Sequence, residues 1–400
     1  MDAYGPQDNG NEIPVAKKMI VSVLMAIVLC FGAYVGGTLL LISQNMTTSH
    51  NALALLQVSD ADAPPIKEPE IPNTLPNDFY VMLLGVDSDE NRANGDEAAY
   101  FEGAFRSDTI IVAHVNLLTK KVSLLSLERD IKTEIYGYGN DTTYKLNAAY
   151  LLGGEPLMRE QAEELLNPSW SDTVINIPYY AVVDMDGMME IIDSVGGIDV
   201  DVEDAFWDPQ LQEGLDQGGW QHLNGHDAVM YCRSRYAWDD GDFARGRHQR
   251  QVLQALASKL MSSNDLFALM NAAETISHHI VTNMPISQIF EVASKLRGIN
   301  TATDIYSMMT PTNSIDINGQ SFQELSTSAW QIVLEQFISN EDPAYAASQL
   351  DAMGIMSGGI DYTPPPEPEV TENAPANDIE AAERAIANGT ATNVTNGPTT

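Results

Sequence analysis

Five arginines lie close together in a chain that carries few basic residues. The chain has 20 Lys and Arg against 56 Asp and Glu, yet one segment of 18 positions contains Arg233, Arg235, Arg245, Arg247 and Arg250. Guanidinium groups are planar, permanently charged donors that match phosphate oxygens two at a time. The clustering therefore indicates a pyrophosphate site, although surface ion pairs with the aspartates between positions 239 and 242 are an equally good interpretation of the spacing alone.

The spacing also predicts which side chains share one anion. We expect the segment Tyr231–Arg235 to be extended, and the two-residue period of a strand then puts Arg233 and Arg235 on one face. On the helix that follows, Arg245 and Gln249 are four positions apart and share a face. A short connecting loop would bring all four side chains together.

Two aspartates suggest a metal ion beside this anion. Asp87 closes one apolar, strand-like run, and the segment Arg106–Thr109, which contains Asp108, opens the next. Neighbouring strands would place Asp87 and Asp108 close together at an edge of the sheet. Hard divalent cations such as Mg²⁺ (or Mn²⁺) prefer one or two carboxylates plus substrate phosphates. A lone Asp more often caps a turn, which is the alternative for each residue taken singly.

A third apolar run ends at Leu127–Asp130. Arg129 in this segment could join the arginine cluster, and Asp130 could orient it. The residue types do not single out a general base, for which Asp87, Asp108 and Asp130 are all candidates.

Alternating strands and helices must position these residues. Period-two and apolar β-branched runs predict strands at 79–86, 109–116, 122–127, 174–183, 198–202 and 304–309, with a hairpin connection at 117–121. Helical spacing predicts helices at 145–166, 185–194, 243–261, 265–277, 286–297 and 325–338. We expect Gly196 and Gly197 to end the helix that precedes them. This alternation predicts an α/β fold, an α-β-α sandwich with a central mixed sheet.

The N-terminal segment predicts a membrane anchor. Residues 19–42 are uncharged and mainly apolar, which as a helix would reach roughly 36 Å against about 30 Å of hydrocarbon. Lys17 and Lys18 precede this run, and no Lys or Arg follows it up to residue 61, so the positive-inside rule places residues 1–18 in the cytoplasm. A cleaved signal peptide is the rival, but its apolar core is normally shorter. We expect a single-pass cell-membrane protein whose residues after Ser43 are extracellular.

The rest of the chain divides by composition. Residues 43–77 are Pro-rich and acidic and predict an extended extracellular linker, 78–345 form the catalytic domain with a C-terminal helical extension, and 346–400 predict a disordered tail. Cys30 lies in the predicted membrane segment and Cys232 lies far along the chain, so we expect no intrachain disulfide between these two cysteines. A formal net charge of -36 argues against nucleic acid as a partner, because such binding depends on many Lys and Arg.

A series of motifs resembles the LytR-CpsA-Psr family. Over roughly Asp78 to Leu260, the chain carries in the family's order the segments at 85–88, 106–109, 125–130, 145–150 (KLNAAY), 195–202 (VGGIDVDV), 231–236 (YCRSRY) and 242–253 (DFARGRHQRQVL). Two departures stand out. Residues 89–105 are inserted where the family reaches the second segment quickly, with Arg92 the nearest equivalent of an arginine common there, and Glu128 stands where the family commonly has Pro.

The resemblance implies a magnesium-dependent phosphotransferase with an apolar channel for a polyprenyl tail. Its partners would be a polyprenyl-pyrophosphate-linked glycopolymer, whether teichoic-acid-like, capsular or arabinogalactan-type, and a peptidoglycan acceptor. By motif, the resemblance implies that Asp87 and Asp108 are metal-associated and catalytic. It implies that six residues bind the pyrophosphate, namely Arg106, Arg129, Arg233, Arg235, Arg245 and Gln249. Of these six, Arg129, Arg233 and Arg235 are also implied to be catalytic. The Met-rich stretch 185–189 could line the channel, but ordinary helix core is the favoured interpretation.

Two other functions fit the same residues. A pyrophosphatase would admit water in place of a sugar hydroxyl, and a non-catalytic module would bind lipid-linked precursors without turnover. The presence of both carboxylates and the arginine cluster favours the enzyme over the binding module.

Overall fold

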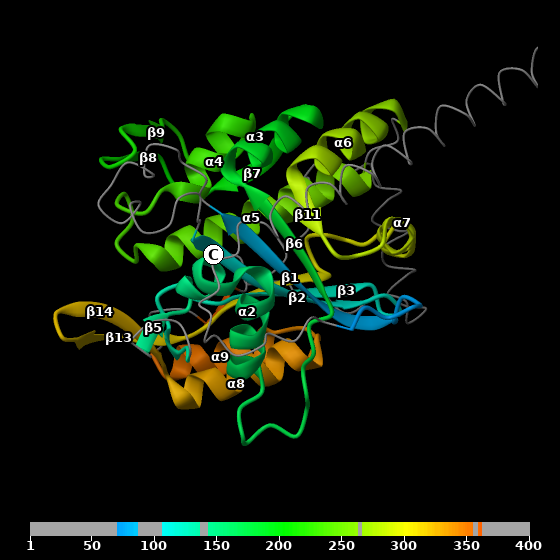
Figure 1. Cartoon of the computed structure of the whole chain (residues 1–400). Helices are drawn as coiled ribbons and strands as arrows, with labels where there is room; N and C mark the ends of the chain where they lie inside the picture. Colours follow the sequence, from blue (N-terminus) through cyan, green and yellow to red (C-terminus); the bar gives the residue numbers. More distant parts are fainter. Residues whose placement is uncertain (1–69, 87–105, 137–142, 263–265, 355–358, 362–400) are drawn as a thin grey trace, which may run out of the picture. The chain divides into compact units, whose positions relative to one another are not determined.

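A seven-stranded mixed sheet forms the centre of the fold (Figure 1). The computed structural model describes residues 70–86, 106–136, 143–262, 266–354 and 359–361. From one edge to the other the strands are β11 (Ile280–Thr282), β6 (Tyr179–Asp184), β1 (Asp78–Val86), β2 (Ser107–Asn116), β3 (Lys121–Ser126), β12 (Ile305–Met309) and β15 (Gly359–Asp361). β1, β2 and β3 are antiparallel neighbours, whereas β6 runs parallel to β1 and β12 parallel to β3. The α/β class, the mixed sheet and the hairpin connection between β2 and β3 are as predicted.

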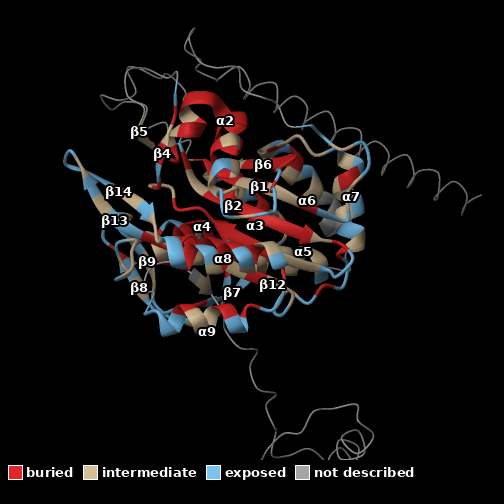
Figure 2. Ribbon diagram, turned by 90° about the horizontal axis from the view of Figure 1, so that it is seen from below, coloured by how far each residue is buried: buried red, intermediate tan, exposed pale blue. Residues whose placement is uncertain are grey.

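Both faces of this sheet are buried because its strands are apolar on both sides. In β1, Met82 and Leu84 belong to one core cluster and Phe79 to another. Strand side chains alternate between faces, so the two clusters lie on opposite sides of the sheet. Figure 2 shows the resulting buried centre. Cutting Met82, which is fully buried, to Ala would cost about 2–5 kcal/mol of stability.

Helices cover the two faces, as Figure 1 shows. One layer contains α2 (Ala148–Leu166), α8 (Thr327–Ser339) and α9 (Ala344–Ala352). The other contains α3 (Met185–Ser194), α4 (Gly225–Arg233), α5 (Asp242–Ser262), α6 (Leu266–His279) and α7 (Ile286–Lys295). The helix expected at 145–166 is α2, which begins at Ala148 and is kinked at Gly153 and Gly154.

A small second sheet packs under α3, α4 and α5. It pairs β7 (Ile198–Val202) with β10 (Gly219–Leu223) and lies outside the central sheet. Ile198, Val200 and Val202 are buried while the aspartates between them are exposed, which is the two-residue period that predicted this strand. Gly196 and Gly197 follow the end of α3 and have φ of 78° and 83°, as expected for glycines after a helix.

The segment around Arg233 is helical, and the extended conformation predicted for Tyr231–Arg235 is wrong. Asn224 caps α4 by accepting a hydrogen bond from the Asp227 amide at 2.9 Å. Ala228, Tyr231 and Cys232 then recur at helical spacing and are buried against the core that α4 shares with α3 and α5. Arg233 is the last residue of the helix, and the chain becomes extended only at Ser234. The burial of this apolar face outweighs the strand-like local pattern.

Several short elements were not predicted. The strand expected at 174–183 is shorter, and begins at Tyr179. Three additional hairpins pair β4 (Lys132–Glu134) with β5 (Thr143–Lys145), β8 (Phe206–Asp208) with β9 (Glu213–Leu215), and β13 (Thr312–Ile317) with β14 (Gln320–Leu325). α9 and β15 carry regular structure to Asp361, beyond the boundary expected at residue 345.

The predicted membrane anchor lies at residues 19–42, outside the described part of the chain. Among the described residues, no helix has both the length and the apolar character needed to cross a membrane. Residues 1–18, most of the predicted linker and the tail from residue 362 also lie outside the described ranges.

Candidate active site

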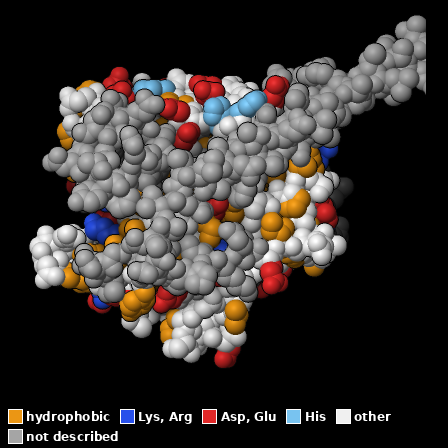
Figure 3. Space-filling model, viewed as in Figure 1, with side chains coloured by type: hydrophobic (Ala, Val, Ile, Leu, Met, Phe, Trp, Pro, Cys, Tyr) orange, Lys and Arg blue, Asp and Glu red, His pale blue; other side chains and the backbone are white. Residues whose placement is uncertain are grey.

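A polar cavity of about 230 Å³ opens at one end of the central strands. The side chains around it come from β2, the segment after β3, α3, the β8–β9 turn, the end of α4 and the start of α5, and they are Asp108, Arg129, Met185, Asp208, Gln210, Leu211, Cys232, Arg233, Arg235, Tyr236, Arg245 and Gln249. We call this the arginine cavity. On the face drawn in Figure 3, basic side chains among the coloured residues form only small patches.

Six of the eight residues singled out from the sequence meet around this cavity. They are Asp108, Arg129, Arg233, Arg235, Arg245 and Gln249. Arg106 is exposed and is not one of the lining residues, and Asp87 lies outside the described part of the chain. The register of β1 and β2 pairs Val86 with Ser107, so the two strand ends that precede Asp87 and Asp108 are adjacent, as predicted. They lie at the ends of two interior strands and not at a lateral edge of the sheet.

The other two clustered arginines have different roles. Arg247 donates to Glu203 and to Asp240 at 3.0 Å or less, which is the surface ion pairing that the spacing left open. Arg250 is 2% exposed and donates to the hydroxyls of Ser126 and Ser307, both at 2.6 Å. Arg250 therefore points from α5 into the protein, although it is a charged residue.

Arg129 and Arg245 are held by two carboxylates, of which Asp108 lines the cavity and Asp242 does not. Arg129 lies 2.9 Å from Asp108 and 3.9 Å from Asp242, and Arg245 lies 2.8 Å from Asp242. Burial lowers the pKa of Arg129, but the neighbouring aspartates outweigh it and hold that pKa above its ordinary value. Burial and the positive charge of Arg129 lower the pKa of Arg245. Both guanidiniums are thus fixed in place before any anion binds.

Arg233 and Arg235 are more accessible. Within the described part of the chain, Arg233 is exposed and has no ion pair with a carboxylate, so its donors are available to a ligand. Arg235 lies 3.7 Å from Asp242, and its guanidinium stands 4.6 Å from the centre of the Tyr236 ring. The cavity therefore combines the buried Arg245 and the half-buried Arg129 with two more accessible arginines, Arg233 and Arg235.

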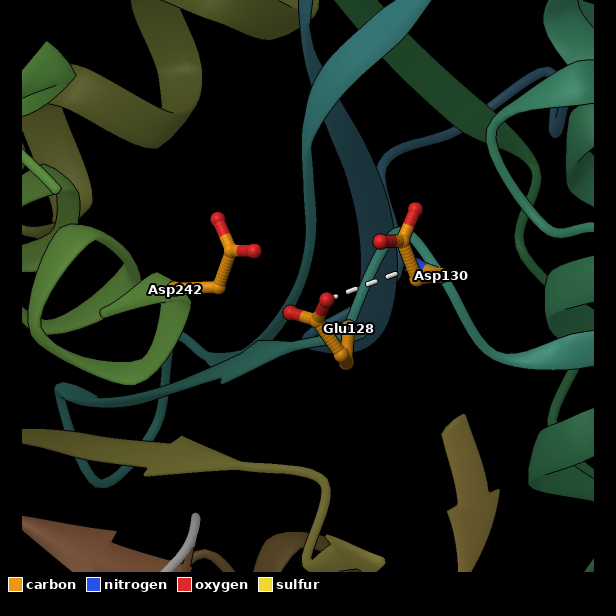
Figure 4. Close-up of side chains that lie close together, drawn as sticks. All are labelled: Glu128, Asp130 and Asp242. Atoms are coloured by element: carbon orange, nitrogen blue, oxygen red, sulfur yellow. Dashed lines mark hydrogen bonds between the residues drawn. The ribbon is translucent and has the colours of Figure 1, made fainter. Parts of the chain in front are cut away.

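Three carboxylates converge beside Arg129, as Figure 4 shows for Glu128, Asp130 and Asp242. Their oxygens lie within 4.8 Å of one another. Burial, followed by the charge of Asp242, raises the pKa of Glu128 from 4.5 to about 7. The Glu128 amide donates to Thr310 Oγ1 at 2.9 Å, a hydrogen bond that the family's usual Pro cannot make. Asp130 lies 3.8 Å from Arg129 Nε, beyond hydrogen-bond distance, and 3.2 Å from Lys145 Nζ.

The oxygens near Arg129 fit a small hard cation. Glu128, Asp130 and Asp242 bring carboxylate oxygens within 4.8 Å of one another, and such oxygens are the ligands that Mg²⁺ prefers. Asp108, 2.9 Å from Arg129, offers a further carboxylate. Asp242 Oδ1 is buried without a directed hydrogen bond, although Arg245 lies close to it. A buried oxygen in that state retains the capacity to accept another ligand.

Asp208 is a buried carboxylate that the sequence reasoning missed. Its Oδ1 accepts from the amides of Gln210 and Leu211 at 2.8 and 3.1 Å, and its Oδ2 accepts from those of Arg235 and Tyr236 at 2.8 and 2.9 Å. Burial raises the pKa of Asp208, but these four backbone donors outweigh it and lower the pKa overall. An Asp-Pro pair, here followed by Gln210, is a turn signal that could have drawn attention to it.

An apolar cavity of about 210 Å³ adjoins the arginine cavity. It lies between β1, β6 and the helices α3 to α6, and its lining includes Leu84, Val182, Met188, Val252 and Leu256. Three residues line both cavities, namely Met185, Cys232 and Gln249. The Met-rich stretch at 185–189, for which helix core was the favoured interpretation, therefore contributes Met185 and Met188 to a cavity wall.

Comparison with known proteins shows the family. The model of the LytR_cpsA_psr family matches residues 44–338, and the chain belongs to this family. A relative named polyisoprenyl-teichoic acid–peptidoglycan teichoic acid transferase TagU, from Enterococcus faecalis, is 34% identical over 220 residues, which cover 55% of this chain and 66% of that protein. The regulatory protein MsrR of Staphylococcus aureus is 30% identical over 66% of this chain and 74% of its own length.

Solved structures share the fold. The crystal structure of Bacillus subtilis TagV matches with a TM-score of 0.54 and 27% identity, over 66% of this chain and 97% of that one. A structure described as TagT bound to LIIa-WTA matches with a TM-score of 0.52 and 20% identity, over 71% of this chain and 99% of that one. The second likeness bears on the fold alone.

Proposed function

We propose that the protein is a membrane-anchored extracytoplasmic phosphotransferase that attaches a polyprenyl-pyrophosphate-linked glycopolymer to peptidoglycan through a phosphodiester. The observation that carries this proposal is that the arginine cavity adjoins the apolar cavity and shares with it the lining residues Met185, Cys232 and Gln249. A lipid pyrophosphate has the same two parts, an apolar chain and a compact polyanion. The name of the Enterococcus faecalis relative supports the same class of reaction.

In the proposed complex the polyprenyl chain occupies the apolar cavity and the pyrophosphate lies among Arg129, Arg233, Arg235 and Arg245. Gln249 lies where the two parts join and can donate its amide to the phosphate nearest the lipid. Four guanidiniums around one diphosphate offset its charge in a partly dry site, where each contact is stronger than in water.

The proposed reaction is an in-line displacement at phosphorus. A hydroxyl of peptidoglycan forms a new P–O bond to the phosphorus next to the sugar, and the P–O bond to the lipid phosphate breaks, so polyprenyl phosphate leaves. The arginines stabilise the negative charge that grows on the leaving oxygens. Asp87, Asp108 and Asp130 are the candidates for accepting the hydroxyl proton, and Asp108 lines the cavity.

We assign a magnesium ion to the carboxylate side of the cavity. Asp108 and Asp87 would hold the ion. Asp87 lies outside the described residues, but it follows Val86, whose strand partner Ser107 precedes Asp108. Asp242 and Asp130 supply further oxygens nearby. When bound, the cation would supply positive charge to the phosphate oxygens and orient them.

The predicted anchor at residues 19–42 would place the catalytic domain outside the cell. The linker of prolines and acidic residues at 43–77 would then hold the site away from the bilayer. A single-pass enzyme of this kind receives both of its substrates, the lipid carrier and the wall, on the outer side of the membrane.

The test is a transfer assay with the full chain in lipid nanodiscs. The substrates are a synthetic polyprenyl-pyrophosphoryl disaccharide and short peptidoglycan oligomers, with and without Mg²⁺, and the products are identified by mass spectrometry. We expect a glycan-phosphate adduct on peptidoglycan that requires the cation and disappears in Arg233→Ala. The matched control is Arg247→Ala, because Arg247 is paired with Glu203 and Asp240 and does not line the cavity.

Other products would identify the rival functions. Free glycan phosphate without an adduct would assign the site to a pyrophosphatase. Tight binding of the lipid without turnover would assign it to a binding module for lipid-linked precursors.

A further inference from the structure

His248 lies buried behind the segment that carries Arg233 and Arg235. It is 0% exposed and belongs to α5. Its imidazole stacks on the ring of Tyr231, with the ring centres 4.0 Å apart, and meets the ring of Trp238 edge-on at 4.7 Å. In the chain, Tyr231 comes shortly before Arg233, and Trp238 comes shortly after Arg235. His248 therefore contacts the chain on both sides of the two accessible arginines.

Hydrogen bonds between these two contacts hold the same segment together. Ser234 is fully buried, and its hydroxyl donates to the Tyr231 carbonyl at 2.8 Å and accepts from Trp238 Nε1 at 3.0 Å. The Trp238 amide donates to the Arg235 carbonyl at 3.3 Å. The backbone from Tyr231 to Trp238 is thus fastened to one hydroxyl and to the rings around His248. Displacement of the imidazole would loosen the segment that presents the two arginines.

The surroundings of His248 favour a neutral imidazole. Its Nε2 lies 3.3 Å from Glu203 Oε2. The hydrogen bonds from His248 and Arg247 hold the pKa of Glu203 at about 2, so this carboxylate is ionised at neutral pH and can only accept. Nε2 therefore carries the proton, and Nδ1 is the bare nitrogen. Within the described ranges, Nδ1 is buried and has no hydrogen-bond partner, so a second proton there would form an N–H group without an acceptor.

The titratable and charged groups that face His248 lie on α4, on α5, after β7 and in the loop after α4, and they are Glu203, Tyr231, Cys232, Asp240 and Arg247. Burial raises the pKa of Tyr231 and of Cys232, so α4 brings no charge to the imidazole at neutral pH. Burial also lowers the pKa of His248, and the charge of Arg247 lowers it further, although Glu203 and Asp240 oppose this change. The imidazolium therefore forms only in acid, below the ordinary histidine value of about 6.5.

We propose that His248 is a positioning residue for Arg233 and Arg235, and that it holds them in place only while its imidazole is neutral. Acid would then weaken the binding of a pyrophosphate in the arginine cavity, although the arginines themselves stay charged. This inference rests on the proposed function, because it takes a lipid pyrophosphate as the ligand. It adds a pH limit to that function, to which a domain outside the cell would be directly subject.

The experiment measures the affinity for farnesyl pyrophosphate at about pH 7.5 and about pH 5, the range over which histidine changes its charge. The full chain in nanodiscs with Mg²⁺ is titrated by calorimetry. Protonation of the lipid affects every variant alike, so the ratio of the two dissociation constants is compared between variants. On acidification, the unaltered protein should lose about three- to tenfold more affinity than His248→Phe, which keeps a ring and has no site for the proton. His248→Gln, which keeps a donor for Glu203, should also lack this extra loss.

The matched control is His226→Phe. His226 is an exposed histidine of α4 that lines neither cavity, so this variant should keep the pH response of the unaltered protein. A second measurement needs no lipid and follows hydrogen–deuterium exchange of residues 231–238, corrected for the intrinsic dependence of exchange on pH. We expect exchange to be faster in acid in the unaltered protein and in His226→Phe, but not in His248→Phe.

The outcomes separate this inference from the function beneath it. An equal pH response of the unaltered protein and His248→Phe in both measurements would overturn the inference. A difference in exchange without a difference in the affinity ratio would also overturn it, because the segment would then move without affecting the arginines. Failure of the unaltered protein to bind farnesyl pyrophosphate at either pH would overturn the proposed function, while acid-induced exchange that is lost in His248→Phe would still support the positioning of this segment by His248.

Discussion

The two adjoining cavities are built in different ways. The apolar cavity is bounded by regular elements, the strands β1 and β6 and the helices around them, and its side chains are held by packing. The arginine cavity is bounded by the ends of elements and by loops, and its side chains are held by charge. Arg129 and Arg245 depend on Asp108 and Asp242, and Asp208 holds the β8–β9 turn to the loop after α4.

The two cavities should respond differently to substitution of the residues that line them. Packing is shared among many contacts, so the apolar cavity should respond to substitutions in proportion to the volume added or removed. Ion pairs are few and partly buried, so loss of one partner leaves an uncompensated charge. Substitutions on the charged side should therefore have larger effects than those on the apolar side.

The largest effect should come from Arg233→Ala. Arg233 is exposed and has no carboxylate partner within the described ranges, so its charge is available to the reacting phosphates. We expect the transfer rate to fall about 10²- to 10³-fold, as when a donor to a developing oxyanion is removed, with little change in the temperature of unfolding. The measurements are initial rates and thermal melts, and Arg247→Ala should keep its rate within about threefold. Equal losses in the two variants would mean that overall charge matters and not the cavity.

The next effect concerns Glu128 and the pH dependence of stability. Its pKa is raised from 4.5 to about 7 by burial, so between these values the folded protein binds a proton that the unfolded chain releases. The free energy of unfolding therefore decreases as pH rises from about 4.5 to about 7, by up to about 3 kcal/mol. Glu128→Gln should remove this decrease, as measured by urea unfolding in detergent at pH 4.5 and 7.5.

An exposed glutamate provides the control for this measurement. Glu324 lies on β14, and Glu324→Gln should keep the pH dependence of the unaltered protein. A Glu128→Gln variant with an unchanged pH dependence would show that the buried carboxyl is not the group responsible.

A smaller effect should follow from filling the apolar cavity. Met188→Trp adds volume where Met188 lines the wall, and we expect the affinity for a long polyprenyl pyrophosphate to fall about tenfold because the chain is partly excluded. A water-soluble short-chain analogue should bind as before. Met188→Leu, which keeps the volume similar, is the control. A parallel loss for both ligands would contradict the assignment of the chain to this cavity.

The smallest effect should come from Thr310→Val. This change removes the hydroxyl that accepts from the Glu128 amide, and the amide is then left buried without that partner. We expect a loss of about 1–2 kcal/mol in the free energy of unfolding, measured with urea. Thr310→Ser keeps the hydroxyl and should lose less than Thr310→Val. If the two variants are equally destabilised, the hydrogen bond is not the cause.

Much of the order of strands and helices could be predicted, because the repeat of buried and exposed residues is visible within a few positions of the sequence. The alternation in β7 and the apolar spacing of α3 each span only a few residues, and the predicted bounds of both elements agree with the structure. Tyr231–Arg235 could not be assigned in this way, because five residues fit a strand or the last turn of a helix equally well. What decides the helix is the burial of Ala228, Tyr231 and Cys232 against other elements.

The sequence by itself determined the composition of the site. Because the motif residues stand at strand ends and at the start of a helix, they converge at one end of the sheet once the strands pair. Six of them do so around one cavity, including Arg233, whose own local structure was predicted incorrectly. A site predicted from several motif positions is therefore more robust than the prediction of any single helix or strand.

Only the tertiary structure decided which charges face the cavity and which support it. Arg245, Arg247 and Arg250 share one helix, yet they face the cavity, a surface ion pair and the interior, respectively. The anchoring of Arg129 by Asp242, the hydrogen bonds from the Arg235 and Tyr236 amides to Asp208, and the junction of the two cavities all join residues distant in the chain. Such contacts depend on how the helices pack on the sheet, and no local pattern in the sequence encodes that packing.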